Sequence, residues 1–419
     1  MLFVDKDGRE VDWIVGYGPP ADTFLEKVQK SLAGTDTYLA LTERYTKEPE
    51  SIEVLYKLAG KDERRYSPEM IKQAEELYRK ILALDPEGKS GTTTIEGLKA
   101  TVSYTEAAEF NLGRMAVFSR KPDPAPLRAF IAKYPQSPIV KSAYASVSVY
   151  YQYYAPKEDA AKFFEEYTAK YPQEATVLNA YVERIIKDKE PVDKGLELAE
   201  KIQEIRGYPR NPEYTQNLAQ LRILKGDEAK AEEEYGPDFI NDYVNESIRV
   251  LTSYANFWLE QNKNLDSVEA MADLAVKMAP ASQWYTLQTA AGIYVKLNKM
   301  AKATDAYGPE FIKKNMTDEG ILGSYASFWN RQGKNLESAL EAAAKSVELS
   351  SDYYNNFTLA NVLVKLKRYE EALVPAEKAV ELVKPVAAKY EGFSIQQYEN
   401  LVKQIKDAIA KEKAPAETK

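Results

Sequence analysis

The chain contains neither cysteine nor histidine in its 419 residues. Without cysteine it forms no disulfide bond and offers no thiolate nucleophile. Without either residue it has no cysteine–histidine zinc site and no nucleophile activated by histidine. The 64 acidic residues supply carboxylate pairs by chance, but nothing marks one pair as buried or perturbed. We therefore expect no enzyme, with no catalytic residues, no metal site and no cofactor.

An excess of positive charge and a long apolar run are also missing. The formal net charge is −8, which argues against nucleic acid as a partner, because phosphate binding needs surplus lysine and arginine. No apolar run reaches the length of a membrane span. The segment Met1–Gly8 has neither the basic start nor the apolar core of a signal peptide. The compartment stays open between periplasm and cytoplasm, since a protein without disulfides is stable in either.

What the sequence does contain is repetition. Three short segments each occur twice, at separations of about 35 or about 70 positions. They are 253–267 with 324–338, 235–240 with 307–312, and 132–136 with 169–173. Such spacing is typical of stacked helical repeats, in which each unit packs only on its neighbours. A repeat array also explains a chain too long for one compact core, and it favours binding over catalysis.

The start of the chain differs from the rest. Leu2–Val4 and 11–15 predict two short strands, and the turn at Asp7–Gly8 suits a hairpin because glycine tolerates a positive φ. A helix is expected over 21–32. Strong helix formers dominate from residue 36 to the end, with proline and glycine between them at short intervals.

The helical part is predicted to consist of nine helix pairs, with a lone helix before them at 36–46. A capping helix at 394–411 and a tail at 412–419 follow them. The pairs span 50–84, 94–133, 138–170, 175–206, 212–241, 248–279, 284–314, 321–349 and 353–384.

The best-formed unit, 353–386, has small residues where two helices would touch, at Ala360, Ala372 and Ala379. Larger apolar residues fill the positions between them. This pattern resembles the tetratricopeptide repeat, strongly over 207–386 and less over the divergent part 36–206. The resemblance implies a mainly α fold, a right-handed α-solenoid of antiparallel helix pairs, and a protein or peptide as partner.

Residues 1–33 carry a second resemblance, to the closing β-hairpin and last helix of a thioredoxin-like domain. It implies that this chain is the C-terminal part of a bacterial protein whose redox-active half, acting in thiol–disulfide exchange, is absent. The alternative is an independent hairpin–helix cap on the solenoid. A two-stranded hairpin is marginal alone, so we expect apolar contacts for Leu2, Val4, Trp13 and Val15.

Two motifs are explained by turns better than by ligands. Gly88–Ser90 resembles the end of a phosphate loop, but the required earlier glycine is missing and a helix leads in. Asp5–Gly8 lacks the further oxygen ligands of a calcium loop. We expect a turn between repeats at the first and a hairpin turn at the second.

Aromatic residues fall into two groups. Tyr254, Trp258, Tyr325 and Trp329 lie at helix-packing positions of the repeated segments and are expected in the core. A second group leaves two interpretations open, ordinary packing or an aromatic-lined groove for a peptide or a sugar. Its members are Tyr144, Tyr150, Tyr151, Tyr153, Tyr154, Tyr353 and Tyr354.

In the tetratricopeptide family the first helices of successive units line the concave face, and the resemblance implies eight groove residues here. They are Asn256, Glu260, Gln288, Lys296, Ser327, Arg331, Asn361 and Lys365. Asparagine offers a donor and an acceptor to an extended peptide. The leading hypothesis is a non-enzymatic scaffold for protein–protein interaction. Alternatives are a glycan- or polymer-binding repeat protein with tyrosine-rich surfaces, and a carboxylate enzyme built on a solenoid.

Overall fold

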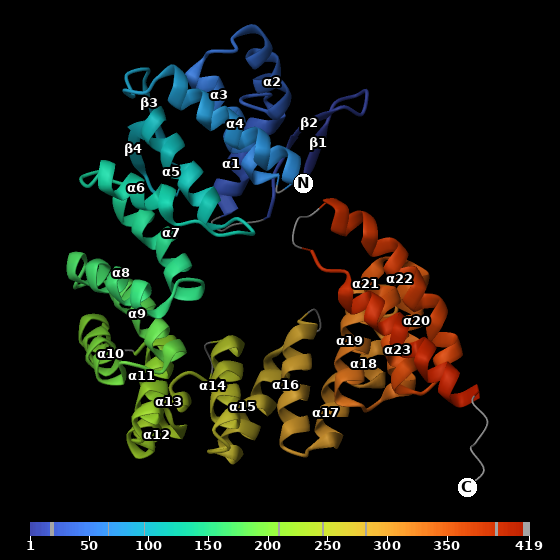
Figure 1. Cartoon of the computed structure of the whole chain (residues 1–419). Helices are drawn as coiled ribbons and strands as arrows, with labels where there is room; N and C mark the ends of the chain where they lie inside the picture. Colours follow the sequence, from blue (N-terminus) through green and yellow to red (C-terminus); the bar gives the residue numbers. More distant parts are fainter. Residues whose placement is uncertain are drawn as a thin grey trace. The chain divides into compact units, whose positions relative to one another are not determined.

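The structure is a computed structural model, and it describes residues 1–16, 21–65, 67–95, 97–207, 210–244, 247–280, 283–389 and 393–413. The chain divides into two compact units, Met1–Arg184 (unit 1) and Ile185–Lys419 (unit 2). Figure 1 labels the helices and strands in chain order. Within the described ranges, no helix is both long and apolar enough to cross a bilayer.

Unit 1 combines two small hairpins with paired helices. Its elements are β1 (Leu2–Val4), β2 (Glu10–Trp13), α1 (Ala21–Leu32), α2 (Tyr38–Lys47), α3 (Ile52–Arg64), α4 (Pro68–Leu84), β3 (Thr92–Ile95), β4 (Ala100–Ser103), α5 (Tyr104–Val117), α6 (Ala125–Lys133), α7 (Val140–Tyr153), α8 (Lys157–Lys170) and most of α9 (Ala175–Asp188).

Unit 2 is helical in all its described elements. They are α10 (Val192–Arg206), α11 (Pro212–Lys225), α12 (Glu228–Tyr235), α13 (Pro237–Asn241), α14 (Ile248–Glu260), α15 (Leu265–Met278), α16 (Trp284–Lys296), α17 (Met300–Tyr307), α18 (Pro309–Lys313), α19 (Glu319–Gln332), α20 (Leu336–Leu349), α21 (Tyr353–Lys365), α22 (Tyr369–Lys389) and α23 (Gln396–Lys413).

Consecutive helices pack against each other as pairs. In unit 2 the pairs are α11 with α12, α14 with α15, α16 with α17, α19 with α20, and α21 with α22. The turns between partners are short, so the two helices of a pair run antiparallel. The predicted fold class is confirmed: the chain is a tetratricopeptide-like α-solenoid with a short N-terminal hairpin and helix.

The N-terminal hairpin is anchored through one aromatic residue and one buried charge. Trp13 is buried against the ring of Tyr38, with ring centroids 4.7 Å apart. The carboxylate of Asp12, 1% exposed, accepts hydrogen bonds from Lys61 Nζ at 2.6 and 2.7 Å and from Ser31 Oγ at 2.7 Å. These bonds join the hairpin to α1 and α3, and they satisfy a carboxylate that burial alone would destabilise.

Three of the four apolar residues that were expected to be packed are exposed, so that prediction was wrong for them. Leu2, Val4 and Val15 are each more than half exposed. Trp13 is the residue of the hairpin that packs on α2, and the described elements leave Leu2, Val4 and Val15 largely uncovered.

The predicted helix pair at 94–133 was wrong at its start, because a second hairpin precedes α5. β3 pairs with β4 in antiparallel register, from Thr92 opposite Ser103 to Ile95 opposite Ala100. Three consecutive threonines and an isoleucine favour the extended chain, since β-branched side chains restrict χ1 and pack well on a pleated surface. The preceding segment Gly88–Ser90 is a turn, as predicted. Its last two amide groups donate to the Asp85 carboxylate at 2.8 Å.

Two predicted second helices, in the units at 212–241 and 284–314, are split. The breaks fall at Gly236–Pro237 and Gly308–Pro309, between α12 and α13 and between α17 and α18. Proline has no amide hydrogen to continue the helix. A Cβ atom at Gly236 would collide with the carbonyl oxygen of Glu232, and one at Gly308 with that of Thr304. Only glycine therefore fits this break without backbone movement.

The repeated tryptophans donate hydrogen bonds to backbone carbonyls at these breaks. Trp258 Nε1 donates to the carbonyl of Tyr235 at 2.8 Å, and Trp329 Nε1 donates to that of Tyr307 at 2.7 Å. Tyr235 and Tyr307 are the last residues of α12 and α17, where helix carbonyls lose their partners within the helix. All four predicted core aromatics, Tyr254, Trp258, Tyr325 and Trp329, are fully buried.

Candidate functional site

The first helices of the pairs in unit 2 lie against one another. α14 contacts α16, α16 contacts α19, and α19 contacts α21, whereas in the described chain the corresponding second helices make no comparable contacts. This difference curves the stack toward the first helices. Their outward side, called here the first-helix face, is formed by α14, α16, α19 and α21.

All eight predicted groove residues lie on these four helices. Asn256 and Glu260 are on α14, Gln288 and Lys296 on α16, Ser327 and Arg331 on α19, and Asn361 and Lys365 on α21. A separation of four residues, or of eight in α16, keeps the two members of each helix on one side. The members nearer the helix start are half-buried, and those nearer its end are exposed.

Part of the hydrogen-bonding capacity of this face is already used. Gln288 Nε2 donates to the Ser324 carbonyl at 3.3 Å, which links α16 to α19. Asn361 Nδ2 donates to the Phe357 carbonyl of its own helix at 2.8 Å. Gln288 Nε2 also donates to the Tyr307 hydroxyl at 3.5 Å, so both of its N–H groups have acceptors. The Asn361 amide keeps a second N–H, and both amides keep acceptor capacity for a ligand.

The exposed row carries three cations and one anion. The cations are Lys296, Arg331 and Lys365, and the anion is Glu260. None of the three cations forms an ion pair within the described structure. Arg331 Nη1 donates to Ser327 Oγ at 2.9 Å. The cations lie in the last turns of their helices, where they interact favourably with the partial negative charge of the helix C-terminus. On a chain of net charge −8, this row is locally positive.

Two tyrosines extend the face, one of which the sequence analysis did not single out. Tyr285 is 58% exposed on α16, and Tyr354 is 46% exposed on α21. Tyr354 precedes Asn361 by two helical turns and so lies on the same side of α21. Its ring covers Gly323 of α19, where a Cβ atom would lie 3.5 Å from the ring and 2.9 Å from Asn355 Oδ1. Tyr354 precedes Asn361 by seven residues and Tyr285 precedes Gln288 by three, and these helical spacings are the sequence signal that points to the two tyrosines.

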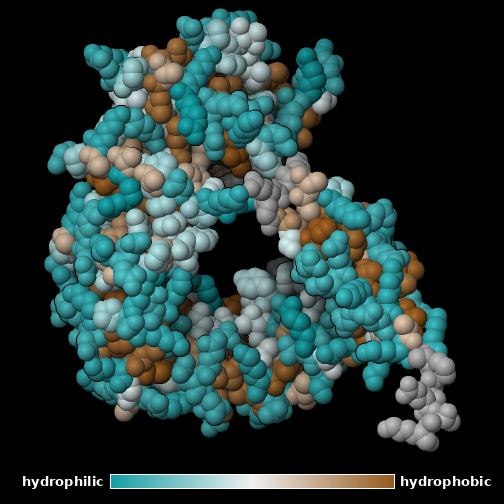
Figure 2. Space-filling model, viewed as in Figure 1, coloured by the Kyte–Doolittle hydropathy of each residue, from teal (hydrophilic) through white to brown (hydrophobic). Residues whose placement is uncertain are grey.

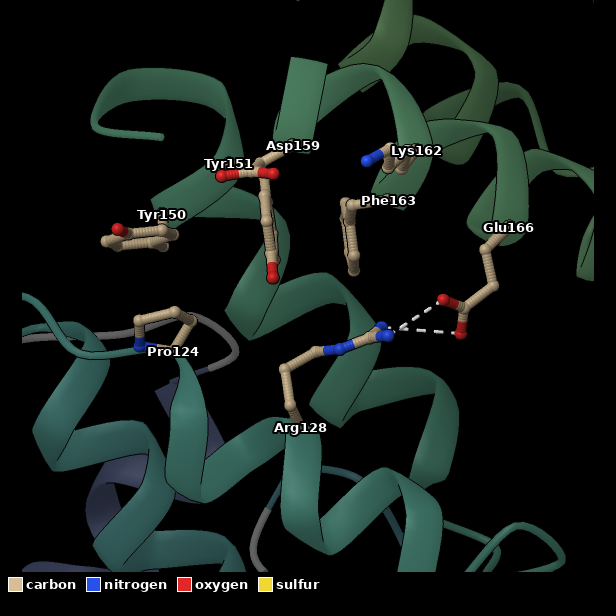
Figure 3. Close-up of a pocket in the computed structure, with 8 residues that line it drawn as sticks. All are labelled: Pro124, Arg128, Tyr150, Tyr151, Asp159, Lys162, Phe163 and Glu166. Atoms are coloured by element: carbon tan, nitrogen blue, oxygen red, sulfur yellow. Dashed lines mark hydrogen bonds and ion pairs between the residues drawn. The ribbon is translucent and has the colours of Figure 1, made fainter. Parts of the chain in front are cut away.

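The tyrosine cluster in unit 1 divides into core, cavity and surface. Tyr144 is buried and stacks on Tyr167 with centroids 5.1 Å apart. Tyr150 and Tyr151 line a cavity of about 300 Å3 between α6, α7 and α8 (Figure 3). Tyr153 and Tyr154 are 57% and 61% exposed. Packing therefore explains Tyr144, whereas Tyr150 and Tyr151 line a cavity and Tyr153 and Tyr154 lie at the surface.

No carboxylate pair suited to catalysis is found among the described residues. Burial raises the pKa of Asp62 to about 7, but no second carboxyl group with a raised pKa faces it. The described chain also has no cluster of three acidic residues that could hold a metal ion.

In the space-filling view hydrophilic residues cover most of the visible surface, with hydrophobic ones in scattered patches (Figure 2).

The architecture places the chain among helical-repeat proteins. The fold is a tetratricopeptide-like solenoid. No family model matches the sequence, and no curated protein matches it.

Several solved structures resemble the chain at low identity. A tetratricopeptide repeat protein from Parabacteroides merdae is 14% identical, with 67% of this chain and 90% of that chain covered and a TM-score of 0.36. Yeast Tom70 is 14% identical, with 96% and 77% covered and a TM-score of 0.46. A structure of Naa15/Naa10 bound to HypK-THB is 14% identical, with 94% of this chain and 64% of that chain covered and a TM-score of 0.42. At this identity the likeness concerns the fold alone.

Proposed function

We propose that the chain is a non-enzymatic scaffold for protein–protein interaction, and that its first-helix face binds an extended acidic peptide segment. The observation that carries this proposal is the pairing of two rows on α14, α16, α19 and α21. One row is half-buried and rich in amides, and the other is exposed and mostly cationic. The eight predicted groove residues are the proposed contacts.

The spacing of the helices suits an extended peptide. Packed helices lie about 8–10 Å apart, and an extended chain advances about 3.3 Å per residue. Successive first helices would thus meet the peptide about every third residue. The half-buried side chains of Asn256, Gln288, Ser327 and Asn361 offer hydrogen bonds at these steps.

The charges favour an acidic partner. Lys296, Arg331 and Lys365 form no ion pair in the described structure, so an incoming carboxylate would not have to displace an existing partner. Complementary charge mainly raises the association rate and fixes the register of the ligand. Glu260 at the α14 side would favour a basic or neutral residue at one end of the peptide.

Selection from a random peptide library displayed on phage tests the proposal. Binding of a selected peptide should weaken about tenfold in the double variant Asn256→Ala and Asn361→Ala, since each hydrogen bond contributes about 0.5–1.5 kcal/mol. The matched control is Asn400→Ala, an exposed asparagine on α23. Equal affinity of wild type and double variant would reject the groove assignment.

For the N-terminal segment we propose an origin as the end of a thioredoxin-like domain. The order hairpin then helix, in β1, β2 and α1, supports this. So do the exposed side chains of Leu2 and Val4, which are suited to packing against further structure. The genomic reading frame upstream of the Met1 codon tests the idea. A Cys-x-x-Cys motif and a proline shortly before Met1 are expected, and their absence would refute it.

A further inference from the structure

The cavity in unit 1 is built from three helices. Pro124 and Arg128 come from the start of α6, Tyr150 and Tyr151 from the end of α7, and four residues from α8 complete the lining (Figure 3). These four are Asp159, Lys162, Phe163 and Glu166. We propose that this cavity binds a neutral carbohydrate, with a pyranose ring stacked on the tyrosines.

The aromatic wall is rigid. Tyr151 stacks on Phe163 with centroids 4.2 Å apart and planes 7° from parallel. Phe163 is itself only 3% exposed. Arg184, 4% exposed, donates to the carbonyls of Tyr151 and Ala155, the second at 3.1 Å, and so fixes the end of α7. A wall that is ordered before binding lowers the entropy cost of capturing a ligand.

Two tyrosine rings form a corner. The plane of Tyr150 is 89° from that of Tyr151, with centroids 5.4 Å apart. Figure 3 shows Tyr150 and Pro124 on one side of Tyr151 and Phe163 on the other. The electron-rich face of an aromatic ring attracts the weakly positive C–H groups of a sugar ring. The corner therefore offers an apolar seat for one face of a pyranose.

The polar lining is balanced in charge. Arg128 pairs with Glu166, Nη2 to Oε2 at 2.9 Å, and its guanidinium lies 5.6 Å from the centre of the Phe163 ring. Burial opposes ionisation of Glu166, but hydrogen bonds from Arg128 and Tyr144 lower the pKa of its carboxyl. Asp159 and Lys162 make no ion pair among the described residues.

Charge balance decides the class of ligand. The lining holds two cations, Arg128 and Lys162, and two anions, Asp159 and Glu166. A phosphate would be repelled by the two carboxylates, and an ammonium ion would be repelled by the two cations. Neutral hydroxyl groups both donate and accept, so they can use either kind of side chain. The volume of about 300 Å3 is at the small end of ligand sites and suits one or two sugar rings.

Calorimetric titration of the full chain with neutral oligosaccharides tests this proposal. The probes are maltotriose, cellotriose, xylotriose, mannotriose and N,N′,N″-triacetylchitotriose at millimolar concentration. We expect at least one to bind, and we expect Tyr150→Ala to weaken it about tenfold, the order expected for losing one aromatic stacking partner. Tyr150→Phe should keep the affinity within about twofold, since the ring remains.

Tyr153→Ala is the matched control, because Tyr153 is exposed on the same helix and does not line the cavity. Circular dichroism melts confirm that each variant is folded. Binding of none of the five sugars overturns the proposal, and so does binding that Tyr150→Ala leaves unchanged. A proline-rich peptide that binds here and is lost with Tyr150→Ala would reassign the cavity to a peptide. Binding of peptides to the first-helix face is measured separately and is unaffected by these outcomes.

Discussion

The two buried tryptophans of the repeated segments each donate a hydrogen bond at a break in a neighbouring helix. Trp258 and Trp329 donate to the last carbonyls of α12 and α17, next to glycines that admit no Cβ atom. Two sequence repeats that look separate, one containing Phe-Trp (253–267 and 324–338) and one beginning with Tyr-Gly-Pro (235–240 and 307–312), are thus parts of one structural unit. The aromatic positions were predictable from spacing, but this hydrogen bond was not, because it joins residues that only the pairing of helices brings together.

Trp258→Ala should lower the free energy of unfolding by about 3–5 kcal/mol, the cost of a large buried cavity. Trp258→Phe keeps most of the ring but leaves the Tyr235 carbonyl without its donor, at about 1–3 kcal/mol. Urea unfolding followed by circular dichroism measures both. Trp329→Phe should give the same loss as Trp258→Phe, and an unchanged midpoint in any of the three would contradict the assignment.

Gly236→Ala and Gly308→Ala should each destabilise the chain by about 1–3 kcal/mol, since the backbone must shift to avoid a carbonyl oxygen. Gly60→Ala is the control: Gly60 lies inside α3 with open space around it, so alanine should stabilise the helix by about 0.5–1 kcal/mol. Thermal melts give the comparison. Equal effects at all three glycines would show that the breaks do not require glycine.

Asp62 is 2% exposed, and its Oδ1 has no hydrogen-bond partner in the described structure. Burial raises the pKa of its carboxyl from 3.8 to about 7. Between about pH 4 and pH 7, the Asp62 carboxyl therefore keeps its proton in the folded state, whereas the unfolded chain releases it. Its contribution to stability is present below about pH 4 and is lost as the pH rises to about 7.

Asp62→Asn removes this dependence, so the variant should gain stability over wild type at pH 8, on the order of a few kcal/mol, and little at pH 4. Melting temperatures across this range provide the test. Asp407→Asn, at an exposed position on α23, serves as control. A gain that does not grow with pH would show that the Asp62 carboxyl is ionised in the folded chain.

At the scale of elements, local pattern decided what could be predicted. Helices with regular apolar spacing were found close to their true bounds, such as α19 and α20 for the predicted pair at 321–349. The hairpin β3–β4 was missed because its strands are only four residues long and lie next to a strong helix. The splits after α12 and α17 were missed because the residues on both sides still favour helix.

The last helix, α23, closes the apolar end of the stack. Leu401 and Ile405 are buried against Ala372 and Ala376 of α22. Ile405→Ala should cost about 2–5 kcal/mol locally. Hydrogen exchange should then rise in α21 and α22 while α14 and α15 keep their protection, because repeats are coupled mainly to their neighbours. A uniform rise across unit 2 would contradict this local coupling.

At the scale of the whole molecule, repetition predicts the solenoid, and each candidate site depends on how helices meet. The eight groove residues lie on the helices that were expected. The cavity was only half foreseen: its tyrosines stand out in the sequence, but Arg128, Phe163 and Glu166 come from other helices without any pattern to join them. The two sites lie in different units and are tested independently.

The claim that an acidic peptide binds the first-helix face is tested most directly by titrating a library-selected, fluorescein-labelled peptide. The triple variant Lys296→Gln, Arg331→Gln and Lys365→Gln removes the cationic row. Lys277→Gln is the control, since Lys277 also lies in the last turn of its helix, on α15. The account predicts peptides rich in aspartate and glutamate, about tenfold weaker binding to the triple variant, and unchanged binding to Lys277→Gln. Peptides without acidic bias, or equal binding to the triple variant, would contradict it.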